Sequence, residues 1–359
     1  MISDPQQSTV LVTGGAGFVG SSFALRWKAR HPGSTVIAFD NLKRRGSELN
    51  LPRLKQAGIQ FVHGDVRNAN DLVQLPHIDA LVECSAEPSV LAGYGAGARY
   101  VVDTNLLGTI NCLELVARDS ADLVFLSTSR VYPIATINEI CTETEEGFEV
   151  DPNTQVPGAG AAGIAEDFPL SGVRSLYGAT KLASELLITE YADANGFRAV
   201  VDRCGVIAGP WQMGKTDQGF VLLWIARHHW DLPLQYTGFG GRGAQVRDVL
   251  HIDDLCDLVT LQLEHMDQVK GRTFNAGGGK ENSAPLSRFT ELAAEVTGKR
   301  IAVGSDVNDR LGDLKLYITD NTRITQATGW APKRDLHTVF RDSFAWLKQH
   351  EDQLRAILA

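Results

Sequence analysis

Short apolar runs alternate with helix-like periods through the first part of the chain. The runs are predicted to be strands, and the segments between them place apolar residues at the spacing of one helix face. Because the runs are apolar throughout rather than at every second position, they are typical of parallel strands buried on both sides. We therefore predict an α/β fold, a Rossmann-like doubly wound parallel sheet with helices on both faces. The predicted strands are 9–12, 35–39, 59–63, 80–84, 123–127 and 199–204, and the helices are 18–30, 101–118 and 176–195.

The alternation becomes irregular after about residue 205, which predicts a smaller, mixed lobe. The chain is expected to return to the sheet near 250–276, through a helical segment and the strand that begins RTFNAGG at 272. Helices at 286–297 and 336–354 are predicted to close the chain. The predicted sheet domain is 1–205 with 250–276, and the predicted lobe is 206–249 with 277–359.

A long insertion interrupts the pattern at 133–170. It is rich in Glu, Gly and Pro, with ETEEGFEVD followed by PGAGAAG. A loop of this length in a compact domain is more often functional or mobile than neutral. A lid over a site and a disordered segment are the two alternatives that the sequence leaves open.

Composition and charge argue against a nucleic-acid-binding protein and against a membrane protein. The 359 residues are 43% hydrophobic and 21% charged, with a formal net charge of −9. The densest basic patch is LKRRG at 42–46, which is too small for a general nucleic-acid surface. No stretch approaches 18 apolar residues, so no membrane partner is expected.

The cysteines and the N-terminus indicate a cytoplasmic protein. Five cysteines are scattered and form no CxxC pair, which argues against a disulfide framework or a zinc site. MISDPQQ at the N-terminus lacks the positive region of a signal peptide. His228–His229 and the pair His251 and Asp253 have no third partner at a useful spacing, so no metal is expected.

The stretch TVLVTGGAGFVG places Gly14, Gly17 and Gly20 after the first strand and into the first helix. These glycines permit the tight turn, the approach of a pyrophosphate and close helix packing. Asp40 ends the second strand, where its carboxylate would accept hydrogen bonds from the adenosine ribose and favour NAD over NADP. Arg44 and Arg45 favour NADP instead, because an arginine nearby could hold its additional phosphate. The other predicted cofactor contacts at these strand ends are Phe18, Val19, Asn41, Asp65, whose predicted partner is the adenine, and Val66.

Tyr177 and Lys181 lie four residues apart in SLYGATKLASE, on one face of the predicted helix 176–195. A free phenol titrates near 10, so a base useful at neutral pH must lose roughly three units, about 4 kcal/mol. A neighbouring ammonium and an oxidised nicotinamide both favour the phenolate. Thr128, at the end of the fifth strand, would hold the same substrate hydroxyl. The alternative is an ordinary surface helix, and the predicted nucleotide cradle favours catalysis.

These motifs together resemble the extended short-chain dehydrogenase/reductase family, the NAD-dependent nucleotide-sugar epimerases and dehydratases. The resemblance covers nearly the whole chain. It implies that Asn105 in DTNLLGT lies at the cofactor and that Arg247 in QVRDVLHIDD holds a nucleotide diphosphate, with Arg310 in RLGD as a second clamp. It also implies a homodimer paired through helices 101–118 and 176–195. It also implies that Thr128, Tyr177 and Lys181 are catalytic and that Tyr177 and Lys181 contact the cofactor.

Within the family, the residues after Thr128 favour an epimerase. Dehydratases carry an acidic pair there, and this chain has Ser129 and Arg130, which are predicted to face the substrate. The chain most resembles the CDP-paratose/CDP-tyvelose 2-epimerases in the insertion and in DNLKRRGSELN (40–50), TDQGFVLLW (216–224) and QVRDVLH. A UDP-hexose 4-epimerase is the nearest alternative, and a non-catalytic NAD-binding regulator or scaffold is the alternative from another class.

Several positions depart from the family pattern. Glu83 and Glu87 stand at the two ends of ECSAE, where the family usually has a histidine and a glutamine. Val206 in RCGVIAGP replaces the usual asparagine, and Pro133 replaces a glycine. Glu87 and Val206 are expected to face the substrate, so these departures leave the sugar and the nucleotide base open.

Overall fold

A seven-stranded parallel sheet forms the larger part of the protein, as predicted. The computed structural model describes residues 1–94, 97–214 and 219–358. All pairings in the sheet are parallel, and the strand order reverses direction between β4 and β1. In sheet order the strands are β14 (Arg272–Ala276), β10 (Ala199–Cys204), β5 (Asp122–Thr128), β4 (Ala80–Glu83), β1 (Thr9–Thr13), β2 (Thr35–Asp40) and β3 (Gln60–His63).

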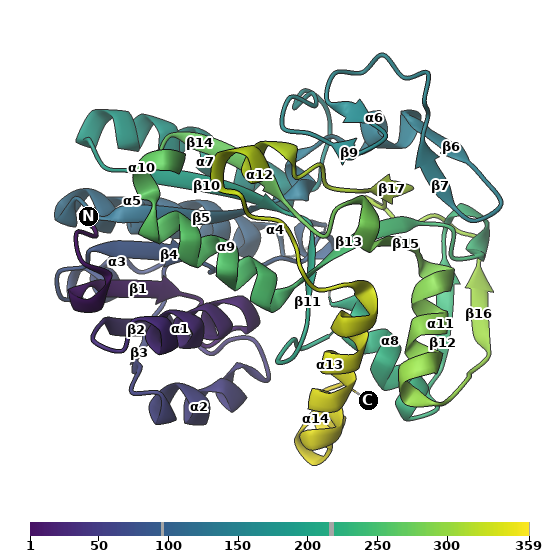
Figure 1. Cartoon of the computed structure of the whole chain (residues 1–359), viewed down its shortest axis with the longest axis horizontal. Helices are drawn as coiled ribbons and strands as arrows, with labels where there is room; N and C mark the ends of the chain where they lie inside the picture. The colour runs from purple at the N-terminus through teal and green to yellow at the C-terminus, as the bar shows by residue number, and fades with distance from the viewer. Residues whose placement is uncertain (95–96, 215–218, 359) are drawn as a thin grey trace.

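Two hydrophobic cores, one on each face of this sheet, explain why its strands are apolar throughout. Val10 and Val12 point into the core beneath α1 (Phe18–Arg30) and α9 (Ile252–Glu264). Leu11, between them, points into the opposite core with α3 (Ala69–Val73), α5 (Gly108–Asp119) and α7 (Leu176–Asn195). The side chains of a strand alternate between faces, so a strand covered on both sides must be apolar at every position. Figure 1 shows the resulting layers, with the smaller lobe beside them.

The predicted helices agree closely with those in the structure, with two differences. The helix predicted at 101–118 is a continuous run of α4 (Ala98–Val102), a π-helical turn (Asp103–Leu107) and α5. The helix predicted at 336–354 divides at His350 into α13 (Leu336–Gln349) and α14 (Glu351–Leu358). Outside the insertion, the helices that were not predicted are α2 (Leu51–Gln56), α3, α8 (Phe220–His229), α10 (Met266–Val269) and α12 (Thr322–Thr328).

The lobe is built on small sheets covered by helices. Its larger sheet pairs β13 with strands on both sides, and α8, α11 and α13 pack together over a core of their own. The division into 1–205 with 250–276 and 206–249 with 277–359 stays a prediction, and two elements cross it: β13 spans residue 250, and α12 packs against β14. The lobe elements are β11 (Val206–Ala208), β12 (Leu234–Thr237), β13 (Val246–His251), β15 (Ser283–Pro285), α11 (Leu286–Thr297), β16 (Val303–Asp306) and β17 (Leu316–Tyr317).

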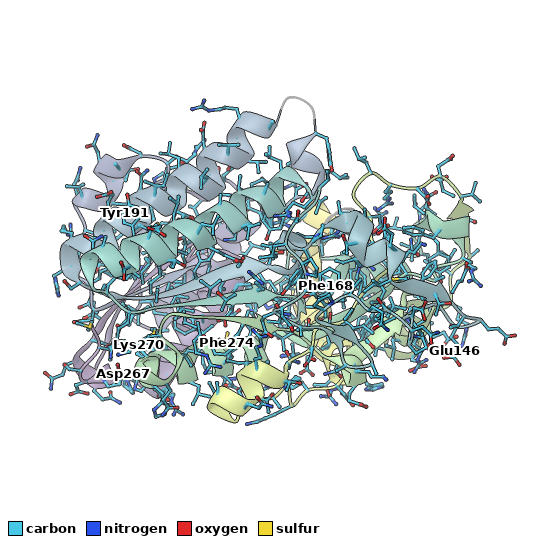
Figure 2. The ribbon with its side chains drawn as sticks, turned by 90° about the horizontal axis from the view of Figure 1, so that it is seen from above. Glu146, Phe168, Tyr191, Asp267, Lys270 and Phe274 are labelled. Carbon is cyan, nitrogen blue, oxygen red and sulfur yellow. The ribbon has the colours of Figure 1, made fainter. Side chains whose placement is uncertain are left out.

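The insertion at 133–170 is folded and packs on the lobe. Phe168 is buried with Tyr132 and Tyr317, and Ile164 bridges to Thr319. In Figure 2 Phe168 lies between the sheet and the lobe, whereas Glu146, in the β6–β7 turn, lies at the far edge from Asp267. The segment is therefore ordered and packed, which neither interpretation of the sequence, a lid or a disordered segment, had described. Its elements are α6 (Ile134–Glu139), β6 (Cys141–Glu143), β7 (Phe148–Val150), β8 (Ala159–Gly160) and β9 (Gly163–Ile164).

The start of α7 is held by a cap and by a close approach. The hydroxyl of Ser175 accepts a hydrogen bond from the backbone N–H of Gly178 at 3.2 Å, as an N-cap does. A Cβ atom at Gly178 would lie 1.9 Å from the carbonyl oxygen of Arg130, so only glycine lets α7 pack this closely on the segment after β5. Tyr177, in the first turn, is placed by both features.

Replacing Ser175 with alanine is expected to lower the free energy of unfolding by about 1 kcal/mol, because the first turn of α7 loses its cap. Denaturant unfolding monitored by circular dichroism measures this change. Ser287→Ala, in the first turn of α11, is the control, since the caps of α7 and α11 are separate. A loss of equal size in the control would contradict a specific role for the cap.

No helix in the described part of the chain is long and apolar enough to cross a membrane.

Candidate functional site

One cleft of about 740 Å³ runs from the C-terminal ends of the sheet strands to the lobe. This is the edge where open α/β sheets bind ligands, next to the point at which the strand order reverses. The cleft gathers most of the residues that the sequence singled out and leaves out the insertion 133–170, as far as the structure describes it. The predicted residues that line it are Gly14, Gly17, Phe18, Val19, Gly20, Asp40, Asn41, Val66, Glu87, Thr128, Ser129, Arg130, Tyr177, Val206, Arg247 and Arg310.

Three predicted cofactor residues do not reach the cleft surface. Asp65 turns to Arg67, whose Nε donates to Oδ1 at 2.9 Å, and to Asn41, whose Nδ2 donates to Oδ2 at 3.0 Å. Asn105 and Lys181 are 1% and 2% exposed. Hydrogen bonding to Arg67 holds the pKa of Asp65 at about 2, so its carboxylate is committed to these partners. The contact predicted between Asp65 and the adenine stays a prediction.

The glycine turn has the shape that a pyrophosphate needs. Gly14 has a φ of 63°, and a Cβ there would lie 2.9 Å from the backbone of Cys84. A Cβ at Gly20 would lie 2.3 Å from the carbonyl oxygen of Gly14. Side chains are therefore excluded from the turn, and the N-terminus of α1 opens into the cleft, where its N–H groups favour an anion. These residues fit a dinucleotide such as NAD.

Asp40 is positioned at the end of β2 by the same turn. Its Oδ2 accepts from the N–H of Ala16 at 3.1 Å and its Oδ1 from the N–H of Leu42 at 2.7 Å. Burial raises the pKa of this carboxyl, and the two amides oppose that shift. Each oxygen keeps a lone pair, which fits the predicted acceptance of ribose hydroxyls.

Tyr100 is a cleft residue that sequence analysis missed. Its ring lies between two cations, with Nζ of Lys43 at 4.1 Å and the guanidinium of Arg67 at 5.0 Å from the ring centroid. Tyr100 therefore lies at the end of the cleft that Asp40 and the rest of the 40–50 segment form. The sequence held no signal for this pairing, because the partners come from three separate segments.

The reacting end of the cleft pairs Thr128 with Tyr177. Both line the cleft, and the Thr128 side chain lies close enough to Tyr177 to favour its phenolate. The Thr128 hydroxyl also accepts from the N–H of Arg130 at 3.2 Å, which fixes its rotamer at the start of a 3-10 turn (Ser129–Val131). β5 ends at Thr128 and α7 begins at Leu176, so strand and helix meet here as the sequence predicted. A substrate hydroxyl that reaches both groups can give its proton to the phenol.

In the free protein the phenol of Tyr177 is a weak acid. Burial raises its pKa to about 12, the Thr128 side chain and the charge of Arg130 oppose the rise, and the charge of Glu87 adds to it. At neutral pH the phenol is therefore protonated. A phenolate at neutral pH requires further positive charge next to the ring, which Lys181 and an oxidised nicotinamide would provide.

Lys181 lies on the inner side of α7, against the sheet. Its Nζ is 3.8 Å from the ring centroid of Phe125 on β5. Burial lowers the pKa of Lys181, and the charge of Glu83 opposes this shift. The prediction that Lys181 lowers the pKa of the phenol stays a prediction, and the structure adds Glu83 as a neighbour that the sequence had placed only as a departure.

Asn105, in the π-helical turn, ties the loop after β4 to α7. Its Oδ1 accepts from the N–H of Glu87 at 2.7 Å, and its Nδ2 donates to the Glu87 carbonyl at 3.1 Å. Nδ2 also lies 3.3 Å from Oγ1 of Thr180, which donates to the carbonyl of Tyr177. Asn105 therefore links the loop that carries Glu87 to the helix that carries Tyr177. Its side chain makes these bonds and is not one of the residues that line the cleft.

Three arginines gather on the lobe side of the cleft. Arg247 donates to Asp313 at 2.8 Å, and Arg130 donates to the carbonyl of Gly312 at 3.0 Å. Burial and the charge of Arg247 lower the pKa of Arg130 to about 10, so Arg130 remains a cation at neutral pH. Arg310 is exposed and lies 3.2 Å from Oγ1 of Thr237. This cationic wall fits a substrate with a diphosphate.

Aromatic side chains complete the lobe end. Trp211, Phe220 and Trp224 line the cleft, and Leu286 lies among them. Trp230, which follows α8, does not line the cleft and donates to Glu351 at 2.8 Å. Residues 216–218 of the TDQGFVLLW stretch lie outside the described residues, and the remainder leads into α8. Flat apolar faces next to arginines suit a nucleotide base.

No group of three or more His, Cys, Asp or Glu side chains within 1–94, 97–214 and 219–358 is placed to hold a metal ion.

Comparison with known proteins relates this cleft to enzymes of nucleotide sugars. The model of the NAD dependent epimerase/dehydratase family matches residues 10–277. The CDP-paratose 2-epimerase of Salmonella typhi is 30% identical and covers 94% of this chain and 98% of its own. The dTDP-glucose 4,6-dehydratase of Streptomyces niveus is 31% identical and covers 94% of each chain. The structure of the Thermus thermophilus UDP-glucose 4-epimerase complexed with NAD has a TM-score of 0.76, is 25% identical and covers 95% of this chain and 99% of that one.

Proposed function

The chain belongs to the NAD-dependent epimerase/dehydratase family, and on that basis we propose that it is a nucleotide-sugar epimerase that inverts C2 of a CDP-hexose. Its cofactor is NAD, as in the structural neighbour crystallised with it. The reaction is of the CDP-paratose/CDP-tyvelose type. The 30% identity to the Salmonella enzyme over almost the whole of both chains supports this choice of reaction.

The observation that carries the proposal is the pairing at the end of β5. Thr128 and Tyr177 both line the cleft that the glycine turn enters, and Thr128 is followed by Ser129 and Arg130. A dehydratase needs an acid beside the sugar to remove a carbon-bound proton and to protonate the leaving hydroxyl. The Arg130 side chain donates to Gly312 and brings positive charge to this position, which favours epimerisation.

The proposed reaction gives successive roles to a few residues of this chain. Tyr177 accepts the proton of the sugar hydroxyl and later returns it, and Thr128 orients the hydroxyl toward the phenol. When bound, NAD would supply the acceptor for a hydride from the same carbon and the donor for its return to the opposite face, so the cofactor would end each turnover in its starting redox state. Arg247 and Arg310 hold the diphosphate while the flat keto-sugar turns over, which requires a sugar subsite with few fixed contacts. Val206, an apolar residue at the cleft, is consistent with such a subsite.

A panel of nucleotide sugars incubated in deuterated water, with the products analysed by NMR, tests the proposal. A CDP-hexose is expected to change configuration at C2 without gaining solvent deuterium, because the transferred hydride comes from the substrate itself. Loss of water from the sugar, or deuterium at the inverted carbon, would overturn the epimerase proposal. The protein as purified is expected to contain bound NAD, since the cofactor is regenerated in every turnover.

Two other functions remain as outcomes of the same panel. Inversion of a UDP-hexose at C4 would identify a UDP-hexose 4-epimerase, which the similarity to the Thermus thermophilus enzyme favours as second candidate. Binding of NAD with no conversion of any sugar would indicate a non-catalytic regulator or scaffold. The positions Glu83, Glu87 and Val206 are the departures that would then be responsible.

Replacing Arg247 with methionine is expected to raise KM for the nucleotide sugar about 10- to 100-fold, because a charge-assisted hydrogen bond to a phosphate contributes roughly 1.5–3 kcal/mol. Steady-state kinetics with the substrate found by the panel measure the change. Arg288→Met is the control: this arginine pairs with Glu291 and Glu295 on the exposed face of α11. An unchanged KM in Arg247→Met would contradict the diphosphate role.

The exposed faces of α7 and the π-helical turn support the predicted homodimer. Leu186 is 65% exposed and Leu107 39% exposed, and they project from the two helices expected to pair. Leu186→Asp is expected to convert the protein largely to monomer in light scattering, since a charge would be buried in the apolar contact. Val307→Asp alters an equally exposed residue of the lobe and is expected to leave the dimer intact. A monomeric parent protein would refute the dimer.

A further inference from the structure

A buried carboxylic acid beneath the catalytic helix takes no part in the proposed reaction. Glu83 is the last residue of β4 and is 1% exposed. Its Oε1 accepts from Oγ1 of Thr109 on α5 at 2.6 Å, and its Oε2, also buried, has no hydrogen-bond partner among the residues that the structure describes. An ionised carboxyl in this place needs a counter-charge, and a neutral one needs a proton.

Lys181 supplies the neighbouring charge. Glu83 pairs in register with Phe125 of β5, and adjacent residues of parallel strands point to the same face. The Nζ of Lys181 lies 3.8 Å from the centre of the Phe125 ring, so the carboxyl and the ammonium lie on the same side of the sheet, next to one ring. Burial raises the pKa of Glu83 and lowers that of Lys181, and the attraction between the two opposes both shifts.

The other titratable groups near Lys181 do not compete for it. Glu185, one turn along α7, accepts from Arg203 at 2.7 Å and from the hydroxyl of Ser127, so its charge is already compensated. Three thiols lie within the electrostatic reach of Lys181, and burial raises the pKa of each, which leaves them neutral at ordinary pH. They are Cys84, Cys112 and Cys204.

We propose that Glu83 is the counter-ion of Lys181, a positioning residue that keeps this lysine charged beneath Tyr177 and thereby sets the pH range in which the phenol acts as a base. The inference rests on the roles proposed above for Tyr177 and Lys181. It gives a function to the acid that stands where relatives usually have a histidine.

Glu83→Gln removes the charge and keeps the acceptor for Thr109. Without the carboxylate, burial lowers the pKa of Lys181 unopposed, so the alkaline limb of the kcat/KM profile moves to lower pH. While Lys181 is still charged, its field on the phenol is no longer opposed by Glu83, so the acid limb moves in the same direction. The expected result is a profile displaced as a whole to lower pH. A profile that stays in place or moves to higher pH overturns the proposal.

Glu114→Gln is the matched control. Glu114 lies on α5, the helix that carries Thr109, but on the exposed side of that helix, where it accepts from the hydroxyl of Tyr191 at 2.6 Å. The substitution changes the net charge by the same amount without altering the buried surroundings of Lys181. Its profile is expected to coincide with that of the parent protein. An equal shift in this control overturns the assignment to Glu83, because it would reflect net charge alone.

Infrared spectroscopy tests the pair without any activity. In Lys181→Met the carboxyl loses its counter-charge and takes up a proton, so the carbonyl band of a buried carboxylic acid is expected in the difference spectrum against the parent. The band is expected to vanish in Lys181→Met/Glu83→Gln. Its absence from Lys181→Met, or a band already present in the parent that Glu83→Gln removes, overturns the proposal. Failure to find any epimerised sugar would leave this result standing, so the two proposals fail separately.

Discussion

Replacing Tyr177 with phenylalanine is expected to lower kcat about 100- to 10,000-fold, the usual contribution of a positioned acid or base. The ring stays in its packed place between Thr128 and the cleft, while the atom that accepts the proton is lost. Bound NAD and KM are expected to change little, because the phenol oxygen faces the reacting hydroxyl. Steady-state kinetics with the substrate from the nucleotide-sugar panel measure the loss.

Tyr191→Phe is the control for this prediction. Tyr191 lies on the same helix near its end, where it donates to Glu114 on the outside of the protein. Its replacement is expected to leave kcat unchanged. Full turnover in Tyr177→Phe would falsify the mechanism, because the phenol of Tyr177 is the group proposed to accept the proton.

Substituting alanine for Gly20 is expected to weaken NAD binding at least about 100-fold. The added Cβ would lie 2.3 Å from the carbonyl oxygen of Gly14, so the turn or α1 must move by roughly 1 Å, and a displacement of that size in a positioned site costs about two orders of magnitude. The protein as purified is expected to lose its NAD. Calorimetric titration with NAD gives the affinity, and circular dichroism shows whether the fold is kept.

Gly160→Ala is the matched control, because a Cβ at Gly160 would meet no atom within 4 Å. Its NAD content and affinity are expected to equal those of the parent. If Gly20→Ala fails to fold, Gly17→Ala provides a milder version, since its Cβ would lie 3.0 Å from the same oxygen. Unchanged NAD affinity in a folded Gly20→Ala protein would refute the cradle.

The parts of the fold that the sequence predicted are those with a strong local signal. The strands of the seven-stranded sheet, α1, α7 and α11 were predicted within a residue or two, because burial on both faces or on one helix face requires an unambiguous apolar pattern. The break at His350 and the π-helical turn at 103–107 were not, since both keep the helical spacing of apolar residues. The insertion 133–170 was misjudged because Glu and Gly dominate its sequence, whereas Phe168 and Ile164 hold it on the lobe.

The candidate site was predicted in its members but only partly in its contacts. Sixteen predicted residues line the cleft, because motifs placed at strand ends converge on one edge of a parallel sheet. Asp65, Asn105 and Lys181 were assigned to the cofactor by motif alone; that assignment stays a prediction, and the structure adds their contacts with Arg67, Glu87 and Phe125. Tyr100 was missed because its cation partners lie 57 and 33 positions away, at Lys43 and Arg67.

The sequence by itself determined the α/β fold, the glycine cradle and the family, since each depends on residue types at fixed short spacings. Only the tertiary structure decided which charged groups lie close enough to shift one another's pKa. The pKa of Tyr177 is raised to about 12 because burial outweighs its nearby cation, and the charge of Glu83 acts on the pKa of Lys181. Electrostatic effects depend on distance and solvent exposure, and neither is encoded in the separation of residues along the chain.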